Sequence, residues 1–174
     1  MIKLRPYQEE ALNAIYEHLR RRDDNPCCVL PTGSGKTAVL ARICQDTAEK
    51  WHGRILVLSH VKELLEQAAS HLASFLPVNM VGLHSAGLGR RDTIHPVIVA
   101  GIQTVYNKAG ELGAFDLIVV DEAHLIPESG EGRYLTFLRD AKIVNPNVRV
   151  IGLTATPFRL GSGRLCKPGN VLNH

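Results

Sequence analysis

The chain has 174 residues, of which 45% are hydrophobic, and its 20 basic and 17 acidic residues give a net charge of +3. That length is enough for one substantial core and too short for two ordinary domains. The mildly basic balance permits nucleic-acid binding without arguing for it.

The apolar segments are all too short to span a membrane, and the first five residues lack the apolar stretch of a signal peptide. We therefore expect no membrane association and a cytoplasmic location. The four cysteines, at positions 27, 28, 44 and 166, include no Cys-x-x-Cys pair and have no histidine at ligand spacing. We expect no zinc in this segment and reduced cysteines that act as small hydrophobic residues.

Apolar runs alternate with helical patterns along the chain. A helix is predicted from Pro6, with Ala11, Leu12, Ile15 and Leu19 on one face. Further helices are predicted over 36–51, 61–75 and 134–142, and strands over 27–30, 54–59, 79–83, 97–101, 115–120 and 148–154. Strands that alternate with crossover helices indicate an α/β fold with a doubly wound, largely parallel sheet covered on both faces.

The alternation breaks near the end of the chain. Gly161, Ser162, Gly163, Pro168 and Gly169 crowd together there, which is typical of turns and linkers. We therefore expect one domain over residues 1–160 and a tail over 161–174 that is cut in a linker or an ordered loop.

Residues 31–37 follow an apolar run and precede a helical pattern, which is the context of a phosphate-binding loop. Gly33 and Gly35 lack the side chains that would keep backbone amides away from phosphate oxygens, and the first amides of the next helix add partial positive charge. Lys36 would reach the β- and γ-phosphates of ATP, and the Thr37 hydroxyl would bind Mg²⁺. The general pattern has glycine where this chain has Leu30, so the loop is a variant form. The candidate loop residues are Pro31, Thr32, Gly33, Ser34, Gly35, Lys36 and Thr37.

Asp121 and Glu122 follow the apolar run 115–120, which reads as a buried parallel strand. Open α/β sheets bind ligands at the carboxyl ends of their strands. There, Asp121 would hold Mg²⁺ directly or through water, and Glu122 would accept a proton from the attacking water. An isolated Asp-Glu pair would read as a solvated acidic turn, but the upstream Lys36-Thr37 pair favours the catalytic interpretation.

The order of these segments carries a family resemblance. The chain resembles the first RecA-like domain of a superfamily 2 helicase. Within that superfamily, its sequence motifs look most like those of bacterial RadD-like and type III restriction-subunit-like helicases. The segments that carry the resemblance are 4–8 (Leu-Arg-Pro-Tyr-Gln), the phosphate loop, 57–64 (Val-Leu-Ser-His-Val-Lys-Glu-Leu), Gln103-Thr104, 121–124 (Asp-Glu-Ala-His) and 154–157 (Thr-Ala-Thr-Pro).

The resemblance implies a role for the amino-terminal segment. Gln8 resembles the glutamine that reads adenine, and its amide carries both the donor and the acceptor that the N6/N7 edge requires. Arg5 or Tyr7 would pack on the purine face. Without the other motifs, Gln8 would read as an exposed helix residue.

The resemblance also implies coupling to a partner domain. His124, Thr154 and Thr156 resemble the elements that relay the state of the γ-phosphate, although the threonines also fit a plain strand end before a proline turn. A second RecA-like domain of the same parent chain would supply the arginines that neutralise the transferring phosphoryl group. Nothing in the sequence assigns Arg159 or Arg164 to that task.

Candidate nucleic-acid contacts follow two other predicted strands, and we expect them on a rim opposite the phosphate loop. A helix amino terminus with hydroxyl and ammonium donors suits backbone phosphate. The candidates are Ser59, His60, Lys62, Gln103 and Thr104, with Arg90 and Arg91 as a weaker basic pair that also fits a solvated surface.

These contacts would tolerate any base sequence, because no aromatic ladder or base-reading motif is present. Phe75, Phe115 and Phe137 fall in apolar patterns and are expected in the core rather than as stacking platforms.

The leading interpretation is an ATP-binding motor domain that couples Mg-ATP hydrolysis to unwinding of, or translocation on, nucleic acid, with DNA favoured over RNA. Two alternatives stay open. One is a nucleotide-binding module with little turnover in isolation, and the other is a P-loop NTPase switch without nucleic acid. Gln8, His60, Gln103 and the threonines of 154–156 argue against a plain switch, which would not need them.

Overall fold

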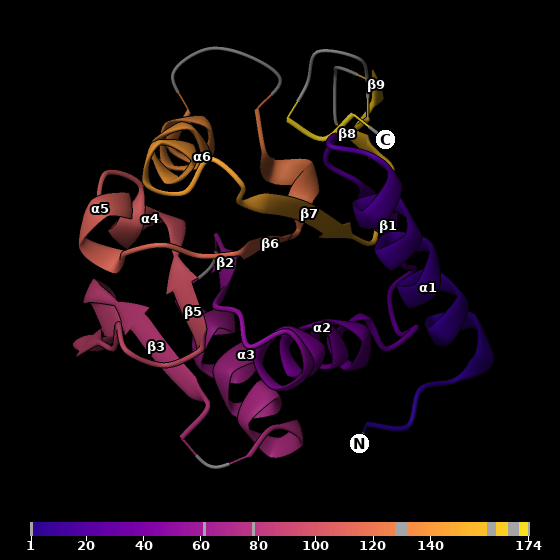
Figure 1. The fold of residues 1–174 in the computed structure, drawn as a ribbon, viewed down its shortest axis with the longest axis horizontal. Helices are drawn as coiled ribbons and strands as arrows, with labels where there is room; N and C mark the ends of the chain where they lie inside the picture. The colour runs from indigo at the N-terminus through magenta and orange to yellow at the C-terminus, as the bar shows by residue number, and fades with distance from the viewer. Residues whose placement is uncertain are drawn as a thin grey trace.

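A seven-stranded sheet forms the middle layer of the protein in the computed structural model, which describes residues 2–60, 62–77, 79–127, 132–159, 163–166 and 171–173 (Figure 1). The strand order is β1-β7-β6-β2-β5-β3-β4, and every pairing is parallel except that of β3 with β4. The doubly wound, largely parallel sheet is therefore confirmed. The strands are β1 (Cys27–Val29), β2 (Ile55–Ser59), β3 (Val81–Ser85), β4 (Arg90–Arg91), β5 (Val97–Gly101), β6 (Leu117–Asp121) and β7 (Arg149–Thr154).

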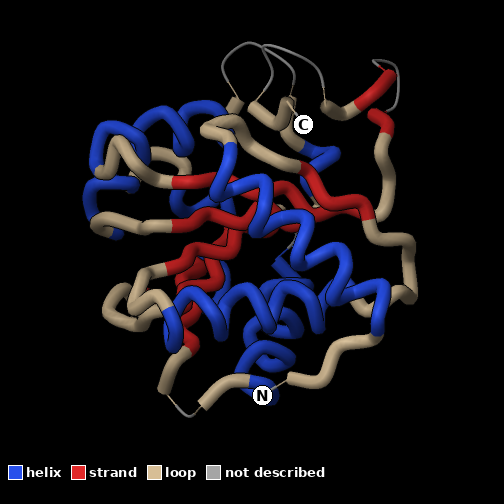
Figure 2. The backbone as a smooth tube through the Cα atoms, turned by 45° about the vertical axis from the view of Figure 1, so that its right-hand side comes forward, coloured by secondary structure: helices blue, strands red, loops and turns tan. Residues whose placement is uncertain are grey.

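Helices cover both faces of this sheet, as Figure 2 shows from a second direction. One face packs against α1 (Pro6–Arg21), α2 (Lys36–Gln45) and α3 (Lys62–Phe75). The other packs against α4 (Ile102–Val105), α5 (Ala109–Leu112) and α6 (Arg133–Val144). Each helix layer removes one face of the sheet from water, so the strands between them can be apolar on both sides.

Strand β2 illustrates how the sequence produces this architecture. Its five residues are all buried, and successive side chains enter opposite cores. Ile55 and Val57 join the cluster under α1, α2 and α3, while Leu56 and Leu58 join the cluster under α4, α5 and α6. An unbroken apolar run is therefore what a central strand of this sheet requires.

Three expectations need correction. The helix expected over 36–51 ends as α2 at Gln45 and continues as a π-helical turn, η1 (Asp46–Lys50). The strand expected over 79–83 is Val81–Ser85, because Asn79 has a left-handed backbone (φ 68°) that cannot open a strand. Phe75 is 43% exposed rather than in the core, since Leu72 and Leu76 take the inward positions at the end of α3.

Several short elements were not predicted. Each is too brief to show a hydrophobic period, which is the main signal that sequence offers. They are β4, α4, α5, the 3₁₀ turns η2 (Ala86–Leu88) and η3 (Ala123–Leu125), and the hairpin of β8 (Phe158–Arg159) with β9 (Gly163–Arg164).

Within the expected tail, only 163–166 and 171–173 are described, so Gly161, Ser162, Pro168 and Gly169 lie outside the described residues. Leu165 and Leu172 are buried in the same core as β6. Asn25 binds this segment through its side chain, which donates to the Val171 carbonyl at 2.8 Å. The described parts of the tail thus pack against the sheet.

In the described ranges, no helix combines the length and the apolar character needed to cross a membrane.

Gly152, in the middle of β7, offers a test of the packing. An added Cβ would lie 2.5 Å from Leu172 Cδ1 and 2.9 Å from Ala123 Cβ. Gly152→Ala should therefore lower the free energy of unfolding by about 1–3 kcal/mol, measured by chemical denaturation. Gly110→Ala is the matched control, because nothing lies within 4 Å of its Cβ position in α5. Equal stability of the two variants would contradict the close packing of β7 against Leu172 and Ala123.

Candidate active site

The predicted phosphate loop leaves the carboxyl end of β1 and enters α2 at Lys36. Gly33 and Gly35 have φ of 78° and 79°, in the left-handed region that glycine adopts without strain. The Ser34 amide donates to the Pro31 carbonyl at 3.0 Å, which closes a tight turn. The loop is therefore compact, and the first amides of α2 open toward the same edge of the sheet.

Helix α1 holds this loop from one side. Gln8 is 4% exposed, and its Nε2 donates to the Ser34 carbonyl at 2.7 Å and to the Gly35 carbonyl at 3.5 Å. Its Oε1 accepts from the Arg5 amide at 2.8 Å, and the Tyr7 hydroxyl donates to the Ser34 carbonyl at 2.7 Å. A Cβ on Gly35 would overlap Gln8 Nε2. Gln8 is thus not an exposed helix residue, while its reading of adenine stays a prediction.

Lys36 joins the loop to the two predicted carboxylates. Its Nζ lies 2.9 Å from Asp121 Oδ1 and also pairs with Glu122 Oε1. Burial lowers the pKa of Lys36, but hydrogen bonds and charge from Glu122 and Asp121 outweigh it, so the pKa lies above its ordinary value. The ammonium is therefore charged, and three residues from two segments far apart in sequence meet at one point.

The backbone at Glu122 is unusual. This residue adopts a left-handed conformation (φ 52°, ψ 51°) immediately after β6, and its amide donates to Asp121 Oδ1 at 3.0 Å. Non-glycine residues seldom take this conformation, and strain of this kind concentrates at functional sites. Across this turn, the carboxylates of Asp121 and Glu122 both reach Lys36.

The predicted coupling residues adjoin this cluster. His124, in η3, has Nδ1 2.9 Å from Thr154 Oγ1 and 3.3 Å from Glu122 Oε2. Thr154 is fully buried at the end of β7, and its Oγ1 accepts from the Thr156 amide at 3.2 Å. A continuous polar path therefore runs from Glu122 through His124 to Thr154 and Thr156.

The donors available for a divalent cation are oxygens. Thr37 lies in the first turn of α2, and Asp121 Oδ2 makes no hydrogen bond to any described residue. Mg²⁺ prefers oxygen ligands and usually takes only one or two from the protein, completing its shell with substrate phosphates and water. Thr37 and Asp121 therefore offer oxygens of the kind that such an ion prefers.

Two predicted nucleic-acid contacts lie together at the ends of β2 and β5. Gln103 Nε2 is 3.5 Å from His60 Nε2, and both side chains are exposed, whereas Ser59 is buried. We expected these residues on a rim opposite the phosphate loop, and that was wrong. Because β1, β7, β6, β2 and β5 are parallel, their carboxyl ends share one edge, with β2 next to β6.

Other candidates are engaged within the chain or lie outside the described side chains. Thr104 Oγ1 accepts from the Ala86 amide at 3.1 Å. Arg90 pairs with Asp92 at 2.8 Å, while Arg91 is exposed. Lys62 begins α3, and Arg159 and Arg164 lie on β8 and β9, but none of these three side chains is among those described.

No local sequence pattern pointed to Tyr134, near the start of α6, as a site residue. Its ring stacks on His60 with centroids 6.4 Å apart, and its buried hydroxyl has no partner among the described residues. Burial raises the pKa of Tyr134, and the charge of Asp121 raises it further. Tyr134 thus stacks on His60 and is near enough to Asp121 to be affected by its charge, a position that has no signature in local sequence.

Known proteins similar to this chain include helicases and a translocase. "Putative mitochondrial ATP-dependent helicase irc3" of Schizosaccharomyces pombe is 33% identical over 99% of this chain and 29% of its own length. "DNA 3'-5' translocase XPB2" of Sulfurisphaera tokodaii is 30% identical over 91% of this chain and 32% of its own length. The chain thus spans about a third of these relatives.

Solved structures agree with the fold. The crystal structure of the Pyrococcus furiosus Hef helicase domain superposes with a TM-score of 0.70 at 32% identity, over 88% of this chain and 33% of that one. The resemblance to the first RecA-like domain of superfamily 2 helicases is confirmed. Residues 1–159 match the model of one family, and the chain belongs to that family, described as type III restriction enzyme, res subunit.

Proposed function

We propose that this chain is the ATP-binding motor domain of a helicase or translocase, in which Mg-ATP hydrolysis drives movement along nucleic acid. The observation that carries the proposal is the convergence of Lys36 with Asp121 and Glu122 at the carboxyl edge of the sheet. Phosphoryl transfer to water requires a phosphate-binding lysine, a metal-binding carboxylate and a base. Here both carboxylates contact the lysine directly.

Each residue has a chemical task in this proposal. Backbone amides of Gly33, Gly35 and the first turn of α2 surround the phosphates, and Lys36 exchanges its carboxylate partners for β- and γ-phosphate oxygens. Thr37 and Asp121 would hold Mg²⁺, which would supply positive charge to those phosphate oxygens. Glu122 accepts the proton of the attacking water.

Coupling to movement uses the neighbouring strand ends. The path from Glu122 through His124 to Thr154 and Thr156 would respond to loss of the γ-phosphate, because a small shift can trade one hydrogen bond for another. The proposed contacts with nucleic acid lie beside β6 and centre on the exposed pair His60 and Gln103, with Ser59, Lys62 and Thr104 at the same two strand-to-helix junctions.

DNA is the favoured track, since the relative from Sulfurisphaera tokodaii is named a DNA translocase. RNA is the alternative that the experiment below includes. The pairing of His60 with Gln103 favours a nucleic-acid motor over a plain NTPase switch, which has no need of that pair.

We further propose that residues 1–160 form the motor domain, with the described parts of 161–174 packed against it, and that 161–174 lead to a second RecA-like domain of the same parent chain. Support comes from the relatives, of which this chain covers 29% and 32%. That domain would supply the catalytic arginines, which are worth several orders of magnitude in rate. A cytoplasmic location also belongs to the proposal.

A nucleotide-binding module is the second candidate for the isolated chain. Among the described side chains, no arginine contacts Lys36, Asp121 or Glu122. The isolated chain would then bind Mg-ATP with little turnover.

The direct test is phosphate release from Mg-ATP by the intact parent protein, with and without single- and double-stranded DNA and RNA. We expect one nucleic acid to raise the rate about tenfold or more, and His60→Ala to reduce that stimulation because it removes the exposed partner of Gln103. His71→Ala, on α3, is the control. Equal release with and without every nucleic acid would contradict a motor and favour a switch.

Lys36→Ala should weaken Mg-ATP binding about 10- to 100-fold, measured by calorimetry on the isolated chain. The change removes the cation and also leaves the charges of Asp121 and Glu122 facing the phosphates. Lys142→Ala, at an exposed position of α6, is the matched control. An unchanged dissociation constant in Lys36→Ala would rule out the phosphate-loop assignment.

Glu122→Gln should keep Mg-ATP binding and lower turnover of the parent protein by about 10²- to 10⁴-fold, because an amide cannot take the proton. Steady-state phosphate release and calorimetry together separate the two effects. Glu111→Gln, on the exposed surface of α5, should change neither. Normal turnover in Glu122→Gln would mean that the base is another residue.

A further inference from the structure

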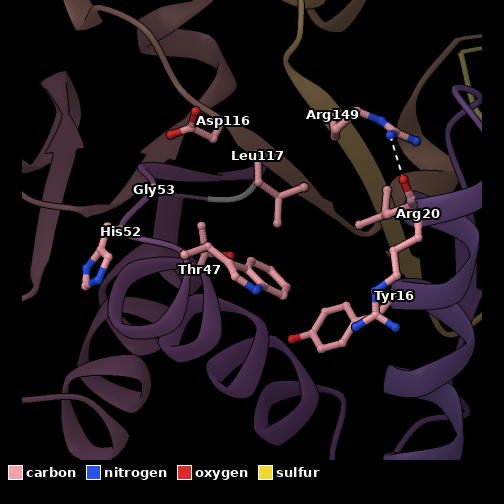
Figure 3. Close-up of a pocket in the computed structure, with 10 residues that line it drawn as sticks. Tyr16, Arg20, Thr47, His52, Gly53, Asp116, Leu117 and Arg149 are labelled. Carbon is pink, nitrogen blue, oxygen red and sulfur yellow. Dashed lines mark hydrogen bonds between the residues drawn. The ribbon is translucent and has the colours of Figure 1, made fainter.

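A cavity lies at the opposite edge of the sheet from the candidate active site, near the amino ends of β6 and β7 (Figure 3). Its volume is about 450 Å³, which falls in the range of small-molecule sites. None of its lining residues belongs to the phosphate loop or to the Asp121-Glu122 segment. They are Tyr16, Leu19, Arg20, Thr47, Trp51, His52, Gly53, Asp116, Leu117 and Arg149.

The two ends of this cavity differ in charge. Figure 3 places Arg20 and Arg149 at one end and His52 and Asp116 at the other, with Leu117 between them. Asp116 is already engaged, because its Oδ2 accepts from the Arg54 amide at 2.8 Å. The end with Arg20 and Arg149 is therefore the end that can bind an anionic group.

Arg20 differs from its neighbours on α1. Arg21 pairs with Glu17 at 3.8 Å and Arg22 with Asp24 at 4.0 Å, whereas Arg20 makes no hydrogen bond or ion pair with any described residue. A guanidinium offers five donors in a fork that matches an oxyanion. The Arg20 guanidinium thus has no partner among the described residues and can bind an anion at the cavity.

Arg149 adds a second positive charge. Its Nη1 donates to the Leu19 carbonyl at 2.8 Å, and its Nη2 donates to the Arg22 carbonyl, so the side chain is fixed at the end of α1. No carboxylate among the described residues pairs with it, and its buried Nε has no partner there. An unsatisfied buried donor calls for an explanation, and an anionic ligand would supply one.

Trp51 provides a flat apolar wall. It is 49% exposed, and it meets the Tyr16 ring edge to face at 5.0 Å. The Tyr16 hydroxyl donates to Asp46 at 3.0 Å, and Asp46 also pairs with Arg42 and Lys50. This network holds Tyr16 in place, so the edge-to-face contact orients the Trp51 ring before any ligand arrives.

The backbone around the cavity is irregular in two places. The π-helical turn η1 carries Thr47 into the lining, and His52 has a left-handed backbone with φ of 51°. π-Helical turns and non-glycine left-handed residues both cost stability and are frequent at functional sites. Both irregularities fall within the segment that shapes this one cavity.

We propose that this cavity binds a small aromatic anion. Its ring would pack between Trp51 and Leu117, and its carboxylate or phosphate would accept hydrogen bonds from Arg20 and from the free Nε of Arg149. The apolar middle and the cationic end together select this chemistry over a neutral aromatic or a simple inorganic anion. The proposal does not depend on the function of the opposite edge.

The experiment compares naphthoate with naphthamide, its neutral amide of similar shape, by calorimetry on the whole chain. We expect naphthoate to bind about tenfold more tightly. Arg20→Gln should weaken naphthoate binding about threefold, since this exposed charge is partly screened, and should leave naphthamide unchanged. Arg21→Gln is the matched control, because Arg21 lies on the same helix and is not part of the lining.

Trp51 is the only tryptophan of the chain, so its fluorescence reports the location of the probe. Naphthoate should quench it with the same dissociation constant that calorimetry gives. The proposal is overturned if naphthoate fails to bind, if naphthamide binds as tightly, if Arg20→Gln equals Arg21→Gln, or if binding leaves Trp51 fluorescence unchanged.

Discussion

The contact of Lys36 with Asp121 and Glu122 is the interaction on which the candidate active site depends. It joins the loop after β1 to the end of β6, which are separated in the sheet by β7. Placed together without a cation, the two carboxylates would repel each other, and without them Lys36 would be an unpaired, partly buried charge. Phosphate oxygens can replace the carboxylates as partners of Lys36, so the same contact that organises the site also prepares it for a polyanion.

The parallel sheet explains why other candidate residues gather nearby. Parallel strands present their carboxyl ends at one edge, and there β1, β7 and β6 position the phosphate loop, Thr154 and Asp121. The next strands, β2 and β5, position His60 and Gln103, and Tyr134 stacks on His60. A nucleotide bound at the ends of β1, β7 and β6 would therefore lie next to the proposed nucleic-acid contacts at the ends of β2 and β5. Coupling between the two ligands requires such proximity.

Local sequence predicted the parts of this site better than their arrangement. The phosphate loop and the Asp121-Glu122 pair were recognisable because each follows an apolar strand, and glycines mark the first turn. The shared edge was missed because strand order depends on crossover paths that no local pattern records. The contact of Gln8 with Ser34 and the position of Tyr134 are likewise tertiary. The π-helical turn at 46–50 was read as plain helix, since its residues continue the helical spacing.

The most direct test of this account is a crystal structure of the chain with Mg²⁺ and a non-hydrolysable ATP analogue. We expect Lys36 Nζ to leave Glu122 for the β- and γ-phosphate oxygens, with the metal held by Thr37 and Asp121. A nucleotide bound elsewhere, with Lys36 still paired to Asp121 and Glu122, would contradict the account.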